Sequence, residues 1–140
     1  MQQQKPIDHP ISKLSYFLRY TAGWKQEVAQ FEETLKEGLG QPGVLTDANI
    51  ARVKRNCIAR REDLELFEAQ AARWAALPGL SRSRRSGLKE LDDNLAAIRS
   101  LDAQIHDTAT LLERATLEQQ MSASDLDWGL AALRGELPRM

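Results

Sequence analysis

The stretch that decides the fold is "LKELDDNLAAIRSLDAQIHDTATLLERA", Leu88 to Ala115. Apolar and small residues recur in it at steps of three and four, the spacing that places side chains on one face of an α-helix. The stripe drifts backwards around the helix as a heptad-like repeat does, which indicates coiled-coil character. We predict a long helix from about Ser86 to Gln120, with Ser81 as an alternative start. The stripe consists of Leu88, Leu91, Leu95, Ile98, Leu101, Ile105, Thr108, Leu112 and Ala115.

Two other long segments are rich in the helix-forming residues Ala, Leu, Glu, Arg and Gln. The first predicted helix runs from about Ile11 to Glu37. The second runs from about Asp47 to Leu77, with Thr46 as its N-cap. One position of the apolar stripe in the second helix is filled by Arg60. Loop-forming Gly and Pro residues separate the helices, and no run alternates like a β-strand.

A fourth, short helix is predicted near the C-terminus. Ser124 and Asp127 resemble a capping box, although Glu or Gln is the usual partner at the third position. Packing of this helix on its own bundle is favoured, and docking into the groove of a partner is the alternative. Its apolar stripe consists of Leu126, Leu130, Leu133 and Leu137, with Trp128 to one side.

Short connections make sequential helices antiparallel neighbours. The predicted fold is therefore all-α: an elongated antiparallel bundle of three long helices plus the short C-terminal helix. The predicted domain organisation is an extended N-terminal arm at residues 1–10 and a single helical-bundle domain at residues 11–140. Pro6 and Pro10 are the reason for expecting an extended arm.

Charge and composition argue against several classes of function. The chain has 140 residues, with 19 basic and 20 acidic side chains and a formal net charge of −1. A dedicated binder of nucleic acid or of anionic membranes usually carries a basic excess. No apolar run is long enough to span a membrane, and the N-terminus lacks a signal-peptide pattern. With a single cysteine, Cys57, the sequence favours a cytoplasmic location.

Signatures of catalysis are missing from the sequence. It contains no Gly-rich nucleotide-binding motif and no Gly-x-Ser-x-Gly motif. Asp102 and His106 are spaced for one helix face, but a metal site usually needs three or four ligands. Cys57 lies on an apolar stripe, where a thiolate is disfavoured. We expect no enzymatic activity, no cofactor and no metal.

Two segments are candidates for contact with a protein partner. The stretch "LSYFLRYTAGW", Leu14 to Trp24, holds four of the eight aromatic residues, and Tyr16, Tyr20 and Trp24 in it step by four. A core role is favoured for this group and an interface role is the alternative. The second candidate is the C-terminal stripe with Trp128. We therefore expect a non-enzymatic protein–protein interaction module (an adaptor, assembly subunit or chaperone-like factor) that binds another protein, a second copy of itself, or both.

A cluster of three arginines, Arg82, Arg84 and Arg85, lies in the segment "LSRSRRSGLKE", Leu80 to Glu90. We call it the arginine cluster. The favoured interpretation is a solvated turn between helices. The alternative is a small helical nucleic-acid-associated protein, in which oligomerisation brings the cluster together with other basic residues. Arginines at a helix N-terminus oppose the helix dipole. Either the helix begins later, near Ser86, or an anion or acidic partner compensates the cluster.

Overall fold

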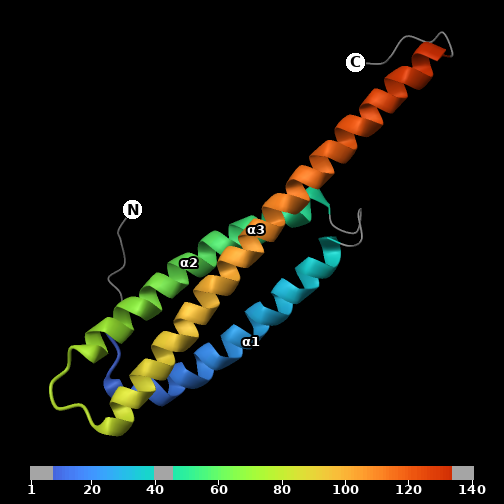
Figure 1. Cartoon of the computed structure of the whole chain (residues 1–140). Helices are drawn as coiled ribbons and strands as arrows, with labels where there is room; N and C mark the ends of the chain where they lie inside the picture. Colours follow the sequence, from blue (N-terminus) through green and yellow to red (C-terminus); the bar gives the residue numbers. More distant parts are fainter. Residues whose placement is uncertain (1–7, 40–45, 134–140) are drawn as a thin grey trace, which may run out of the picture.

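The computed structural model describes residues 8–39 and 46–133, with side chains described as far as Ala115 in the last helix. A short 3₁₀ helix, η1 (Ile11–Lys13), leads into α1 (Leu14–Leu39). Two longer helices follow, α2 (Asp47–Ala75) and α3 (Arg82–Leu133). Every regular element in these two ranges is a helix, which confirms the predicted all-α class (Figure 1).

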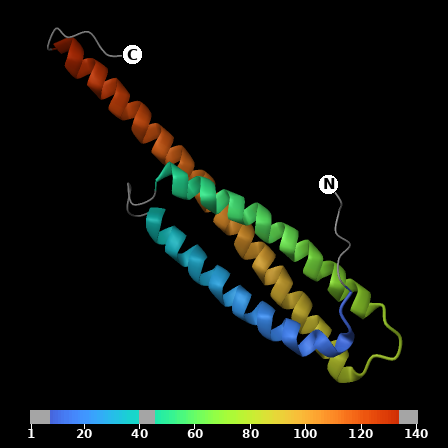
Figure 2. The same cartoon turned by 180° about the vertical axis from the view of Figure 1, so that it is seen from behind.

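The three helices pack together around α3. Both α1 and α2 make their main contacts with α3, and α2 runs antiparallel to the other two (Figures 1 and 2). The stripe predicted from Leu88 to Ala115 supplies the α3 side of the core, although Leu101 is half-buried and Ala115 is exposed. The α3 residues of the apolar core are Leu88, Leu91, Leu95, Ile98, Ile105, Ala109 and Leu112.

Local sequence signals set the starts of α2 and α3. Thr46 caps α2 as predicted, because its side-chain oxygen accepts a hydrogen bond from the Asn49 amide at 3.2 Å. The Ser81 hydroxyl accepts from the Arg84 amide at 3.1 Å in the same way. As a result α3 begins at Arg82, close to the earlier of the two predicted starts, and the arginine cluster lies in its first turn.

The predicted separate C-terminal helix is wrong, because α3 continues without a break to Leu133. No Gly or Pro occurs between Gly87 and Gly129, so nothing stops the helix before Ser124. Extending an existing helix also avoids the cost of nucleating a new one. We call residues 116–133 the extension. α3 has 52 residues against 29 in α2, and the extension projects past the ends of α1 and α2 (Figures 1 and 2).

Residues Asp8 to Pro10, the described part of the predicted N-terminal arm, lie against the C-terminal part of α2. The His9 amide donates to Gln70 Oε1 at 2.8 Å, and Trp74 Nε1 donates to the His9 carbonyl at 2.8 Å. The Asp8 carboxylate accepts from Gln70 and from Arg73, and these contacts lower the pKa of Asp8. Side chains of α2 thus hold the segment that leads into η1.

No helix within the described ranges has the length and apolar character needed to cross a membrane.

Replacing Gly23 with alanine should stabilise the protein. Gly23 is an exposed position inside α1, and a Cβ atom built there meets nothing within 4 Å. Alanine restricts the unfolded chain and favours helix, so we expect a gain of about 0.5–1 kcal/mol in the free energy of unfolding. Urea unfolding measures it. The control is Gly79→Ala, which should destabilise because Gly79 has a φ of +69°. A loss of stability in Gly23→Ala would contradict the expectation.

Candidate interaction surfaces

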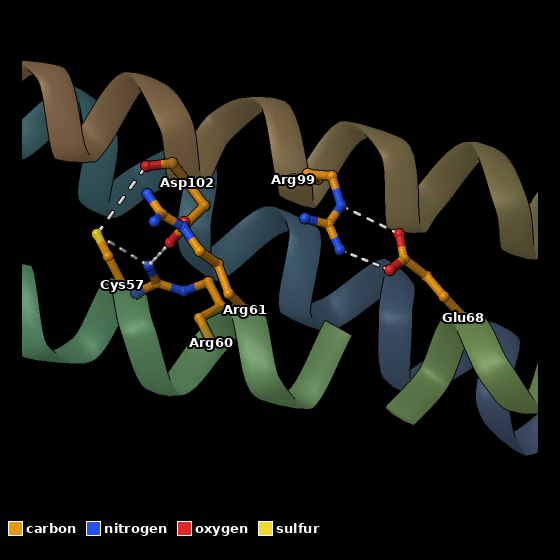
Figure 3. Close-up of polar contacts among 6 residues, drawn as sticks. All are labelled: Cys57, Arg60, Arg61, Glu68, Arg99 and Asp102. Atoms are coloured by element: carbon orange, nitrogen blue, oxygen red, sulfur yellow. Dashed lines mark hydrogen bonds and ion pairs between the residues drawn. The ribbon is translucent and has the colours of Figure 1, made fainter. Parts of the chain in front are cut away.

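A buried carboxylate, Asp102 of α3, lies at the centre of the α2–α3 interface. Its side chain is 1% exposed, and both of its oxygens are paired (Figure 3). Arg60 Nη1 lies 2.5 Å from Oδ1, and Arg61 Nε lies 2.9 Å from Oδ2. This geometry explains why an arginine interrupts the apolar stripe of α2: the position faces a carboxylate. A shift of α2 along α3 would separate the buried Asp102 carboxylate from both arginines, so the contact favours the observed register.

Cys57 lies beside this ion pair and is fully buried. Its Sγ is 3.9 Å from the Asp102 carbonyl oxygen and 3.8 Å from Arg60 Nη1 (Figure 3). Burial, followed by the negative charge of Asp102, raises the pKa of the thiol. A buried and protonated thiol is a poor nucleophile. Cys57 therefore packs as a small core residue, in agreement with its place on the apolar stripe.

A second polar contact fixes α1 on α3. The Asn94 side-chain amide donates to the Thr21 hydroxyl at 3.1 Å, and the Thr21 hydroxyl in turn donates to the Phe17 carbonyl at 2.8 Å. Lys25 Nζ donates to the Asn94 oxygen at 3.3 Å. Because Thr21 and Asn94 are buried, a shift of α1 along α3 would leave polar groups without partners.

The aromatic residues predicted on α1 do come together. Tyr16 and Tyr20 are 57% and 51% exposed, whereas Trp24 is half-buried. The rings of Tyr20 and Trp24 each lie 5.5 Å from the ring of Phe67 on α2, and the Tyr20 ring is nearly parallel to it. The group therefore bridges α1 and α2 at Tyr20 and Trp24, and it reaches solvent at Tyr16 and Tyr20. The α1 sequence alone gave no sign of Phe67, which the stripe of α2 supplies.

The arginine cluster does not form a turn, because its members belong to the first helical turn of α3. All three side chains are exposed, as the solvated interpretation requires. That first turn contains no acidic residue. None of the three guanidinium groups has an ion-pair partner within residues 8–39 and 46–115. The cluster stands at the end of the bundle opposite to the extension (Figure 1).

A groove runs beside the arginine cluster, between the end of α2 and the start of α3. We call it the terminal groove. Its volume is about 470 Å³. Leu77, Leu80 and Leu88 supply its apolar lining, and Leu77 is 42% exposed. Arg85 and Lys89 add positive charge, and Asp92 is the single acidic residue of the lining. The lining is therefore mixed, with leucine side chains next to two basic groups and one carboxylate.

A neighbouring groove of about 370 Å³ lies further along α2 and α3. Its lining includes Ala71, Ala72 and Ala96, with the Glu68–Arg99 ion pair at one side. Arg99 binds both Glu68 oxygens, with Nη2–Oε1 at 2.5 Å and Nε–Oε2 at 3.1 Å (Figure 3). Both side chains are partly exposed, so we assign this pair a small contribution to stability.

The remaining predicted interface residues lie in and after the extension. Leu126, Trp128, Leu130 and Leu133 belong to α3, but their side chains lie outside the described residues, and Leu137 lies outside them altogether. The favoured expectation, that this segment packs back on its own bundle, is wrong: α3 carries its backbone away from α1 and α2 (Figure 2).

No group of three or more His, Cys, Asp or Glu side chains that could hold a metal ion occurs in the described part of the chain. A comparison of the chain with known protein families, curated proteins and solved structures found no match.

Proposed function

We propose that the chain is a non-enzymatic protein–protein interaction module that binds a partner through the extension of α3. The observation that carries this proposal is the continuation of α3 past the ends of both other helices (Figure 1). An isolated helix of this length is marginally stable in water. A partner that covers one of its faces would supply the packing that α1 and α2 supply to the rest of α3.

The sequence of the extension suits binding in a helical groove. Leu126, Leu130 and Leu133 stand at positions i, i+4 and i+7, the anchor spacing of helix-in-groove recognition. Trp128 adds a residue type that often dominates binding energy at interfaces. The heptad-like repeat of the preceding part of α3 makes a coiled coil with a partner helix the preferred form of this contact.

The proposed role is that of an adaptor, an assembly subunit or a chaperone-like factor, and the proposed location is the cytoplasm. The free, buried Cys57 suits a reducing compartment. The exposed rings of Tyr16 and Tyr20, towards the other end of the bundle, are the second surface proposed for protein contact.

The nucleic-acid alternative has less support. It needs basic side chains of α2 to join the arginine cluster, but several of them are already paired with carboxylates. Lys54 pairs with Glu113 at 3.0 Å, and Arg60 and Arg61 both pair with Asp102. Each of these basic groups is therefore at least partly neutralised by a carboxylate, although only Arg60 is largely buried.

The test uses the double variant Leu126→Asp/Leu130→Asp of the full chain. The wild-type chain is first used to capture a protein partner from a nuclease-treated lysate, and the binding of that partner to the variant is then measured. We expect at least about thirtyfold weaker binding of that partner, because hot-spot residues contribute 2 kcal/mol or more. Circular dichroism should show the melting temperature of the bundle nearly unchanged, since both sites lie beyond α1 and α2.

The matched control is Gln120→Asp/Ser124→Asp, which adds the same charge at the same spacing on a face about 120° around the helix from Leu126 and Leu130. It should retain the partner. Retention of the partner by Leu126→Asp/Leu130→Asp would show that the extension is not the binding element. Loss of every partner on nuclease treatment would favour the nucleic-acid alternative.

A further inference from the structure

The first turn of α3 is an unusual place for three arginines. The N-terminus of a helix carries partial positive charge, so basic side chains there are repelled and acidic groups are attracted. The arginine cluster is exposed, and the first turn of α3 lacks any acidic residue that would offset it. An acidic partner at this end would be attracted by the guanidinium groups and by the helix dipole together.

The terminal groove next to the arginine cluster also limits which partner segment can bind there. Its lining of Leu77, Leu80 and Leu88 suits side chains such as leucine or methionine, and Arg85 and Lys89 lie in the same lining. Asp92 is the one carboxylate in the lining, and two basic groups outnumber it. The surface therefore fits a segment that offers both leucine-like and acidic side chains.

The extension has that composition. It contains Glu118, Asp125 and Asp127 and no lysine or arginine, together with its leucines and Met121. It cannot reach the terminal groove of its own chain. Arg84 and Asp125 are 41 positions apart on one continuous helix, a separation of about 60 Å. The two complementary surfaces can meet only between two copies.

We propose that the acidic extension of one copy binds the arginine cluster and terminal groove of a second copy. This inference rests on the proposed function, because it names the partner of the extension. Each copy carries the two surfaces at opposite ends (Figures 1 and 2). An antiparallel pair therefore forms both contacts at once and closes as a symmetric dimer.

The test reverses each set of charges in the purified, nuclease-treated full chain. One variant is Arg82→Glu/Arg84→Glu/Arg85→Glu, and the other is Glu118→Lys/Asp125→Lys/Asp127→Lys. Each variant alone brings like charges together at both contacts, and we expect its self-association to weaken by about a hundredfold or more. An equimolar mixture restores opposite charges at both contacts, so it should form the dimer again. Analytical ultracentrifugation at low and high salt measures the mass, and circular dichroism checks that each variant is folded.

A wild-type chain that stays monomeric, or a mixture of the two variants that fails to associate, would overturn the inference. Masses that grow beyond the dimer would support the same contact repeated in an open chain. In a parallel preparation made without nuclease, nucleic acid that co-purifies with the wild type and not with the glutamate variant, in the absence of self-association, would assign the arginine cluster to nucleic acid instead. If self-association is absent but Leu126→Asp/Leu130→Asp still abolishes capture of a different protein, the proposed function stands and this inference fails.

Discussion

Replacement of Asp102 with alanine is expected to lower the free energy of unfolding by about 3–5 kcal/mol. The change removes the carboxylate that pairs with Arg60 and Arg61 in the α2–α3 interface. Arg61 is partly exposed and can turn to solvent, but the Arg60 side chain is only 15% exposed. It would become a largely buried charge without a counterion, which is the costly state. Urea unfolding, with linear extrapolation to water, measures the loss.

Two controls separate this effect from a general sensitivity of the interface. Arg99→Ala removes an exposed ion pair between the same two helices and should cost no more than about 1 kcal/mol. The double variant Arg60→Leu/Asp102→Leu removes both buried charges and should recover most of the lost stability, or exceed the wild type. If Asp102→Ala lowers the free energy of unfolding by no more than Arg99→Ala does, Asp102 and its two arginines do not behave as a buried ion pair.

Replacement of Trp74 with alanine is expected to cost about 3–5 kcal/mol, because it opens a large cavity where α1, α2 and the N-terminal segment meet. Trp74 is buried, and its ring lies 4.8 Å from the ring of Phe17 in an edge-on arrangement. Its Nε1 also donates to the His9 carbonyl at 2.8 Å. Hydrogen exchange should show faster exchange at residues 8–13 in addition to the lower global stability.

The control is Trp74→Phe, which keeps an aromatic ring and removes the indole donor. We expect a smaller loss than for alanine, with the exchange of residues 8–13 still faster. The His9 carbonyl retains a second donor, Gln70 Nε2 at 3.4 Å, so the lost hydrogen bond should cost about 1 kcal/mol. Equal losses of unfolding free energy in Trp74→Ala and Trp74→Phe would show that the volume of the indole ring does not determine the stability lost.

Local signals in the sequence predicted the helices well. The three- and four-residue steps from Leu88 to Leu112 mark the core face of α3, and Thr46 marks the start of α2. These features depend on side chains within a few positions of one another, which a sequence displays directly. Arg60 was visible as a gap in a stripe, but its partner Asp102 is 42 positions away. Only the packing of α2 on α3 reveals why the gap is filled by a charge.

The same dependence on local signals explains the errors. Ser124 and Asp127 resemble a helix start, yet both side-chain types also occur inside helices at a cost of about 0.5 kcal/mol each relative to alanine. Nothing nearby forces a break, so α3 continues to Leu133. The contacts of His9 with Gln70 and Trp74 could not be predicted from the sequence. In each hydrogen bond His9 contributes a backbone group, its amide or its carbonyl, and every residue type except proline has both. The sequence therefore predicts the helices and most of their buried faces, but it does not predict the contacts between distant segments.

The arrangement of α1 and α2 on a shared α3 also sets the order in which the chain closes during folding. The Glu68–Arg99 contact between α2 and α3 spans 31 positions, whereas the Thr21–Asn94 contact between α1 and α3 spans 73. The entropy lost on loop closure grows with the logarithm of loop length, so the longer loop costs about 0.8 kcal/mol more. We therefore expect the α2–α3 hairpin to close before α1 joins it.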